Sequence, residues 1–435
     1  GDETTGGALS GFSGRSGAVG SGLEALIAGE ISLTGPNSIG VLLASNSGKL
    51  QTTAPISVTG DFGTGIAAVG TVIDVDLDEE LTVGKGTAFL FGAEDFPIFD
   101  DLDGVLANEV SLSIGANVTA TTPFDSVLFD ARGTGFGIVN EGKSVTGFGD
   151  GFKVGGAAPG MFILDNRDGG TIDVSGEMFD VSADQVVLTN LVGGALAAGD
   201  LGSFSDVAKL DLTNEGAITA RGDGLRIVGE ESAEYTISNT GAVEVSDDVA
   251  LRFQTLAGSS THQFGNGGTI TGTDGAGVGF VIGDGGSVTF VNEAELEAKV
   301  DAALIAAGDG SFVAATNSGR LSSGDGAGFS AVAPNVVFTN TGTLEGLGFG
   351  RTVDDRPTVP GGERPGAALD IVGDDARIEN SGTITSRVVS PIDGDAPIPA
   401  GIAIRHDGNG FALNNASTGV ITGFVEIANP EDKPA

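Results

Sequence analysis

Few residues of this chain have the types and spacing that catalysis or ligand binding requires. Asp100, Asp101 and Asp103 form a compact acidic group. Acidic turns supply the oxygen ligands that Ca²⁺ prefers, although the surrounding segment lacks suitable residues at the first and last positions of an EF-hand loop. We therefore take these three aspartates as candidate metal ligands, with Ca²⁺ as the ion, and expect no required cofactor. The alternative is a solvated acidic surface that keeps the protein soluble.

Other matches to functional motifs are incomplete. Residues 137–144 match the phosphate-binding loop GxxxxGK[ST], but that loop needs a helix after it, and a strand pattern follows here. Residues 221–223 read Arg-Gly-Asp, a triplet that cell receptors can recognise, yet Gly-Asp pairs are ordinary turn residues throughout this chain. The two histidines, His262 and His406, lie far apart. Residues 373–375 resemble one fragment of a pectin-hydrolase signature whose other elements are missing, so we expect no enzyme.

Asparagine is the polar residue that recurs at a regular spacing. Consecutive copies are separated by 23 to 27 residues, and an apolar residue stands two positions before each copy. Most copies also have Gly two positions later and an apolar residue four positions later. The pattern returns at Asn380, with a degenerate copy near Asn415 and an early copy at Asn46. The regular series consists of Asn140, Asn166, Asn190, Asn214, Asn239, Asn266, Asn292, Asn317 and Asn340.

Short strands must position these asparagines. In residues 212–239, glycine-containing turns separate three segments that alternate apolar and polar residues, and no segment has a helical period. A unit of about 24–26 residues cannot bury its apolar side alone, whereas stacked units can. The sequence therefore predicts an all-β, right-handed parallel β-helix of about 14 coils. Equivalent asparagines would stack, so we expect them to form a structural ladder of side-chain amides.

Three segments are distinguished along the chain. Residues 1–23 are a Gly/Ser-rich tail, which we treat as a candidate assembly segment. Residues 51–135 fit the repeat poorly, so we predict irregular coils or a cap over residues 24–130 and a regular β-helix over residues 131–430. Because the first residue is Gly rather than Met, we expect a removed signal peptide or a trimmed chain.

Two insertions interrupt the regular segment at the same position of the repeat. They lie near residues 351–365 and 387–400, and adjacent coils would place both loops on one face. Such loops often form the binding surface of a repeat protein, and basic loops suit the acidic flank of another copy. The alternative is a pair of solvated loops with local ion pairs. The residues expected to make the contact are Arg351, Arg356, Arg364 and Arg387.

The composition narrows the class of protein. The chain has 435 residues, with 59 acidic and 20 basic side chains that give a net charge of −39, and it contains 75 glycines and no cysteine. This charge repels nucleic acid and anionic lipid, and the lack of cysteine excludes disulfides and thiolate metal sites. No apolar run approaches the roughly 18 residues that a membrane helix needs, so we expect no membrane insertion. The hydrophobic content of 40% is sufficient for a core.

The turns at residues 239–241, 317–319, 340–342 and 380–382 read Asn, Ser or Thr, then Gly. In this respect residues 131–425 resemble the passenger domains of bacterial autotransporters and related secreted β-helix surface proteins. The resemblance implies secretion, display at the cell surface, and adhesion or matrix building. No membrane β-barrel follows in this sequence, so we expect either a cleaved barrel or another export route.

Two functional hypotheses remain. The first is an extracellular or bacterial cell-surface protein with a structural or adhesive role, which associates with itself as a homo-oligomer or polymer in a filament, layer or matrix. The alternative is a polysaccharide-active β-helix enzyme or a carbohydrate-binding passenger domain, with a surface glycan as partner. Fibres visible by electron microscopy would favour the first, and paired carboxylates about 5–9.5 Å apart would favour the enzyme.

Overall fold

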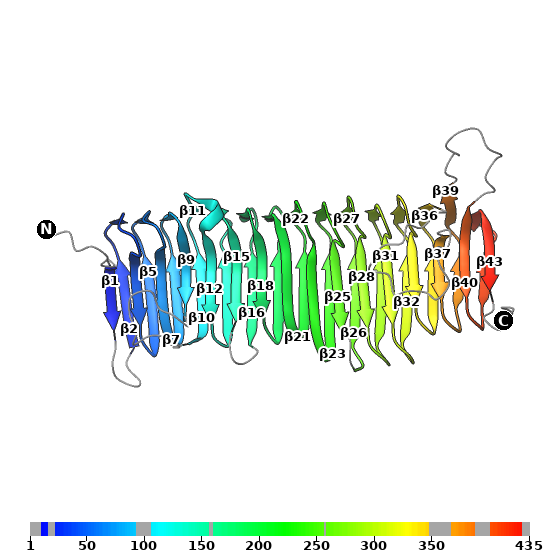
Figure 1. Cartoon of the computed structure of the whole chain (residues 1–435), viewed down its shortest axis with the longest axis horizontal. Helices are drawn as coiled ribbons and strands as arrows, with labels where there is room; N and C mark the ends of the chain where they lie inside the picture. The colour runs from blue at the N-terminus through cyan, green and yellow to red at the C-terminus, as the bar shows by residue number, and fades with distance from the viewer. Residues whose placement is uncertain are drawn as a thin grey trace. The chain divides into compact units, whose positions relative to one another are not determined.

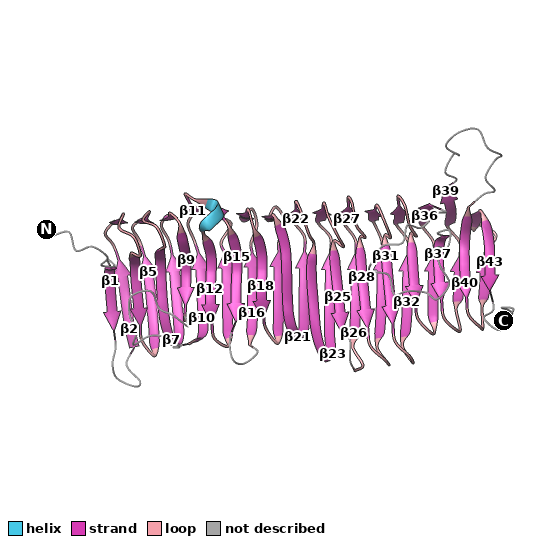
Figure 2. Cartoon of the chain, in the orientation of Figure 1, coloured by secondary structure: helices cyan, strands magenta, loops and turns pink. Residues whose placement is uncertain are grey.

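The computed structural model describes residues 10–15, 22–92, 106–155, 160–255, 258–347, 367–387 and 401–428. These residues form strands and turns, with one short 3-10 helix, η2 (Pro123–Asp125), among them (Figures 1 and 2). Every recorded strand pairing is parallel, and the strands stack as coils of a β-solenoid with about 14 turns. The predicted all-β parallel β-helix is therefore confirmed.

The chain divides into two compact units. The first contains Gly1–Val207 and Thr213–Ala220, and the second contains Ala208–Leu212 and Arg221–Ala435. Within each unit a coil has three strands, which stack on their equivalents in the next coil and so build three columns. We call these columns face 1, face 2 and face 3, in the order in which the chain visits them.

In the first unit, face 1 contains β1 (Ser10–Arg15), β4 (Ile39–Ala44), the first half of β7 (Gly63–Leu77), β9 (Gly86–Phe91), β12 (Val127–Arg132), β15 (Asp150–Gly155), β18 (Glu177–Ser182) and the start of β21 (Asp200–Asn214). Face 2 contains β2 (Gly22–Ile27), β5 (Ser47–Thr52), the second half of β7, β10 (Ala107–Ile114), β13 (Gly135–Asn140), β16 (Met161–Asn166) and β19 (Gln185–Asn190). Face 3 contains β3 (Ile31–Leu33), β6 (Ile56–Val58), β8 (Leu81–Val83), β11 (Val118–Ala120), β14 (Ser144–Phe148), β17 (Thr171–Val174), β20 (Ala195–Ala198) and β22 (Ala217–Ala220).

In the second unit, face 1 contains the start of β23 (Leu225–Asn239), β25 (Leu251–Thr255), β28 (Val278–Ile282), β31 (Ala303–Ala307), β34 (Phe329–Val332), β37 (Ala367–Val372), β40 (Ile402–Asp407) and β43 (Phe424–Ala428). Face 2 contains the end of β23, β26 (Thr261–Asn266), β29 (Ser287–Asn292), β32 (Phe312–Asn317), β35 (Val336–Asn340), β38 (Arg377–Asn380) and β41 (Ala412–Asn415). Face 3 contains β24 (Ala242–Val245), β27 (Thr269–Gly272), β30 (Glu295–Ala298), β33 (Arg320–Ser323), β36 (Thr343–Leu347), β39 (Thr383–Arg387) and β42 (Val420–Thr422).

The core of each unit is a set of side-chain columns inside the coils. Alternate residues of most strands point inward, and these inward positions are mostly buried and apolar. Parallel register places like residues above one another: the rings of Phe152 and Phe179 are 5.6 Å apart, and those of Phe264 and Phe290 are 5.1 Å apart. Ring pairs at these distances are stabilising beyond the area they bury. The core therefore fixes the register that positions the outward side chains.

Residues 24–130, predicted as irregular coils or a cap, contain three-strand coils in register with the later ones. The last inward position of face 2 is filled in turn by Ile27, Thr52, Leu77 and Ile114, and Asn140 follows in the same column. The assignment of an early repeat copy to residue 46 was wrong: that asparagine is exposed, ahead of β5, because the ladder position of its coil belongs to Thr52.

Candidate functional site

The asparagines of the first unit form a continuous hydrogen-bonded column at the end of face 2. The Nδ2 atom of Asn140 donates to Oδ1 of Asn166 at 2.9 Å, Asn166 donates to Asn190 at 2.8 Å, and Asn190 donates to Asn214 at 2.8 Å. All four side chains are buried. Glycine leaves room for this column, since a Cβ at Gly170 would lie 2.5 Å from Oδ1 of Asn166.

The second unit has its own column with the same direction of donation. The Nδ2 atom of each asparagine donates to Oδ1 of the next at 2.8 Å, except that Asn380 donates to Asn415 at 2.7 Å. The column runs through Asn239, Asn266, Asn292, Asn317, Asn340, Asn380 and Asn415. The degenerate copy near residue 415 thus occupies the ladder position, although it is exposed.

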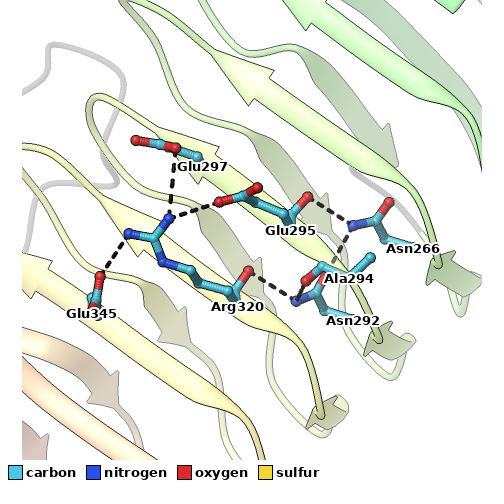
Figure 3. A network of polar contacts seen from close by, with 7 residues as sticks. All are labelled: Asn266, Asn292, Ala294, Glu295, Glu297, Arg320 and Glu345. Carbon is cyan, nitrogen blue, oxygen red and sulfur yellow. Dashed lines mark hydrogen bonds and ion pairs between the residues drawn. The ribbon is translucent and has the colours of Figure 1, made fainter.

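The ladder amides also close the turns that follow them. Nδ2 of Asn140 donates to the carbonyl of Lys143, and the amide of Lys143 donates back to Oδ1, both at 3.0 Å. In the second unit Nδ2 of Asn292 donates to the carbonyls of Ala294 and Arg320 (Figure 3). Strand β14, not a helix, follows the turn at Lys143. The match to a phosphate-binding loop is therefore a ladder turn, without the helix N-terminus that phosphate binding requires.

A charge network on face 3 of the second unit links three coils (Figure 3). The guanidinium of Arg320 on β33 contacts Glu295 on β30 at 2.7 Å and Glu345 on β36 at 2.9 Å, with Glu297 at 3.9 Å. Hydrogen bonds, first to Glu345 and then to Glu295, raise the pKa of Arg320 above its ordinary value. These ion pairs are accessible to solvent, so they contribute little to the free energy of folding. The three glutamates are already paired with the guanidinium of Arg320.

Acidic residues are also stacked in register on face 1 of the first unit. Asp150, Glu177 and Asp200 occupy one column position in successive coils, and Lys153 contacts Asp150 at 2.8 Å. Partial burial and then the neighbouring Asp180 raise the pKa of Glu177 above its usual value. The column places like charges near one another, with one lysine to offset them.

Both histidines lie inside the coils. Nε2 of His262 is 3.1 Å from the hydroxyls of Thr255 and Ser260, which are 2.8 Å from each other. Burial lowers the pKa of His262 to about 4. Nε2 of His406 is 2.9 Å from the carbonyl oxygen of Gly373. Neither imidazole is exposed, so neither is placed to exchange protons with a bound substrate.

The predicted metal and loop residues lie outside the part of the chain that the structure describes. This applies to Asp100, Asp101 and Asp103 and to Arg351, Arg356 and Arg364. The backbone of Arg387 ends β39, and its side chain is not described. Among the described residues, no group of three or more histidine, aspartate or glutamate side chains is arranged to hold a metal ion. No helix in the same residues is long and apolar enough to cross a membrane.

Two surfaces of the second unit were not predicted from the sequence. The first is face 2 of the second unit, where the outward side chains of β26, β29, β32 and β35 carry no charge. The second is the coil formed by β41, β42 and β43, whose inward side chains are partly exposed. The first could have been found by reading the residues between the inward positions of each strand, since alternation assigns them to the outer surface.

Comparison with protein-family models, with curated proteins and with solved structures found no match to this chain. The parallel β-helix is thus established by the strand pairings of the chain itself.

Proposed function

We propose that this chain is an extracellular structural protein of a bacterial surface, similar in role to the autotransporter passengers it resembles, and that it associates with itself coil upon coil. The observation that carries the proposal is the exposed coil of β41, β42 and β43. Val425 and Ile427 on β43 are 41% and 56% exposed. In the preceding coil their register partners, Ile404 and His406, are fully buried.

These side chains occupy inward columns that every earlier coil of the unit covers. Ile421 on β42 follows Ile384, and Leu413 on β41 follows Ile378; the earlier residue is buried and the later one is half-buried. Within the described residues each of the three strands pairs along one edge only. An unpaired edge with apolar side chains beside it favours the addition of further strands.

A second copy of the chain supplies strands of the required kind. Within the described residues, face 1 of that copy begins with β1, which pairs only with β4. Docking β1 on β43 would continue the parallel ladder of face 1 and cover the exposed side chains of Val425 and Ile427. The two contacting surfaces differ, so repetition of the contact yields a filament unless a ring closes. High salt should favour this contact, because it screens the repulsion between copies with a charge of −39.

The test is sedimentation and negative-stain electron microscopy of the chain in 0.5 M salt. Ile427→Asp places a charge in the exposed column and should abolish fibres or large species, whereas Val192→Asp, at a 63% exposed turn position, should leave them unchanged. Circular dichroism verifies that both variants keep their strands. A wild-type chain that stays monomeric at every concentration, or fibres that persist in Ile427→Asp, would overturn the proposal.

A further inference from the structure

We propose that face 2 of the second unit binds a neutral polysaccharide. The binding surface, called here the charge-free face, is made by the outward side chains of β26, β29, β32 and β35. The proposal adds a ligand to the proposed surface role and uses a different part of the molecule from the coil contact. The outward residues are Thr261, Gln263, Gly265, Ser287, Thr289, Val291, Phe312, Ala314, Thr316, Val337 and Thr339.

The distribution of charge selects the class of ligand. The chain carries 59 acidic residues, yet four successive strands of this face present none. Charges return at its margins, with Glu234 on β23 on one side and Arg377 and Glu379 on β38 on the other. A nucleic acid or an acidic glycan would be repelled by the surrounding molecule, and a basic partner would gain nothing from this face. A neutral ligand avoids both penalties.

The side chains that replace the charges have the chemistry of sugar recognition. Gln263, Thr289 and Thr316 are exposed and can both donate and accept hydrogen bonds, as sugar hydroxyls do. Phe312 on β32 is 46% exposed. The face of an aromatic ring has a negative quadrupole, which attracts the weakly positive C–H groups of a pyranose ring. A face that carries hydroxyl and amide groups together with an exposed ring is therefore suited to an uncharged sugar chain.

The size of the face favours an extended chain over a folded protein. With coils about 4.8 Å apart and about 3.3 Å per residue along a strand, its four strands cover roughly 350–400 Å². A stable protein interface needs about 800 Å² on each partner. A second copy of this chain therefore finds too little charge-free surface here, whereas an oligosaccharide segment can lie across several coils.

The face is held in place before any ligand arrives. The pairings β26–β29, β29–β32 and β32–β35 proceed without a register shift. Beneath them Phe264, Phe290 and Phe338 are buried in one column, with the Asn ladder beside it. Outward groups therefore repeat at the spacing of the coils, and binding costs little ordering of the protein.

Retention on insoluble neutral polysaccharides tests the proposal, with cellulose, chitin and starch as the probes. We expect the wild-type chain to bind at least one of them, and Phe312→Ala to weaken that binding about tenfold or more. Thr289→Lys, which leaves the aromatic ring in place, should weaken binding to a similar degree. Phe124→Ala removes a ring that is 85% exposed on η2 of the first unit and serves as the matched control, with binding unchanged.

Failure of all three polysaccharides to retain the wild type would overturn the proposal, and so would equal losses in Phe312→Ala and Phe124→Ala. The sedimentation assay separates this result from the coil contact. Phe312→Ala should form the same large species as the wild type, whereas Ile427→Asp should lose them and still bind polysaccharide. If the wild type shows only one of the two properties, the proposal that predicts the missing property fails and the other stands.

Discussion

The first unit fills one position of its interior in two different ways. The last inward position of face 2 is occupied by Ile27, Thr52, Leu77 and Ile114 in the early coils. In the later coils it is occupied by Asn140, Asn166, Asn190 and Asn214. The column is continuous, because Ile114 pairs with the first asparagine. The same backbone geometry therefore accepts an apolar stack or a stack of amides.

The two solutions place different demands on their neighbours. An apolar side chain gains from burial whatever apolar group lies above or below it. A ladder asparagine needs an acceptor on one side and a donor on the other, and a buried amide without them costs about 1–3 kcal/mol for each unpaired group. The apolar coils should therefore tolerate changes of shape, and the amide coils should tolerate no interruption.

Placing an amide in the apolar column should have the largest effect. Leu77→Asn removes a buried leucine and points the Nδ2 donor of its amide toward Ile114, whose side chain offers no acceptor. We expect a loss of about 4–5 kcal/mol in the free energy of unfolding, measured as a shift of the urea midpoint at constant slope. Ile114→Asn is the matched control, because its Nδ2 atom can donate to Oδ1 of Asn140. Equal losses in both variants would contradict the role of the neighbour.

The reverse exchange should cost less but still be severe. Asn166→Leu places an apolar side chain, as found in the early coils, in the amide column. The substitution removes the oxygen that accepts from Asn140 and the nitrogen that donates to Asn190. We expect a loss of about 2–4 kcal/mol, by the same urea measurement, because two buried amides lose a partner each. A loss below about 1 kcal/mol would mean that the ladder bonds add nothing beyond the packing of the column.

The same comparison shows what the sequence could reveal. The three-strand coil and the ladder were predictable from the spacing of asparagine, because an Asn turn has a fixed hydrogen-bond geometry and a Gly beside it. The regular register of the early coils was not predictable, because an apolar residue at the ladder position leaves no such signature. What these coils do keep is an apolar residue four positions after the ladder position, at the start of the face 3 strand. Ile31 follows Ile27 in this way, and Leu81 follows Leu77. The charge-free face was missed because only inward positions were followed along the repeat.

His262 extends the comparison to a buried polar group without a ladder. Its pKa of about 4 lies below the value of 6.5 for an exposed histidine, so the folded chain disfavours the charged form. The stabilising preference for neutral imidazole is present above pH 6.5 and is lost as the pH falls toward 4. We expect the wild type to lose roughly 2–3 kcal/mol more than His262→Leu over this interval, from the 1.36 kcal/mol of each pKa unit. Urea unfolding at pH 7 and pH 4 measures the difference, and parallel pH profiles would contradict it.

The smallest expected effect has the opposite sign and lies within the apolar column itself. Thr52 is the polar member of that column, and its buried Oγ1 has no hydrogen-bond partner among the described residues. Thr52→Val keeps the shape of the side chain and removes the unpaired hydroxyl, which should stabilise the fold by about 1 kcal/mol. Thr53→Val is the control, since that neighbouring hydroxyl donates to the carbonyl of Ile27 and should not stabilise when removed. A gain for Thr52→Val alone would show that this column prefers apolar contact wherever an amide cannot be continued.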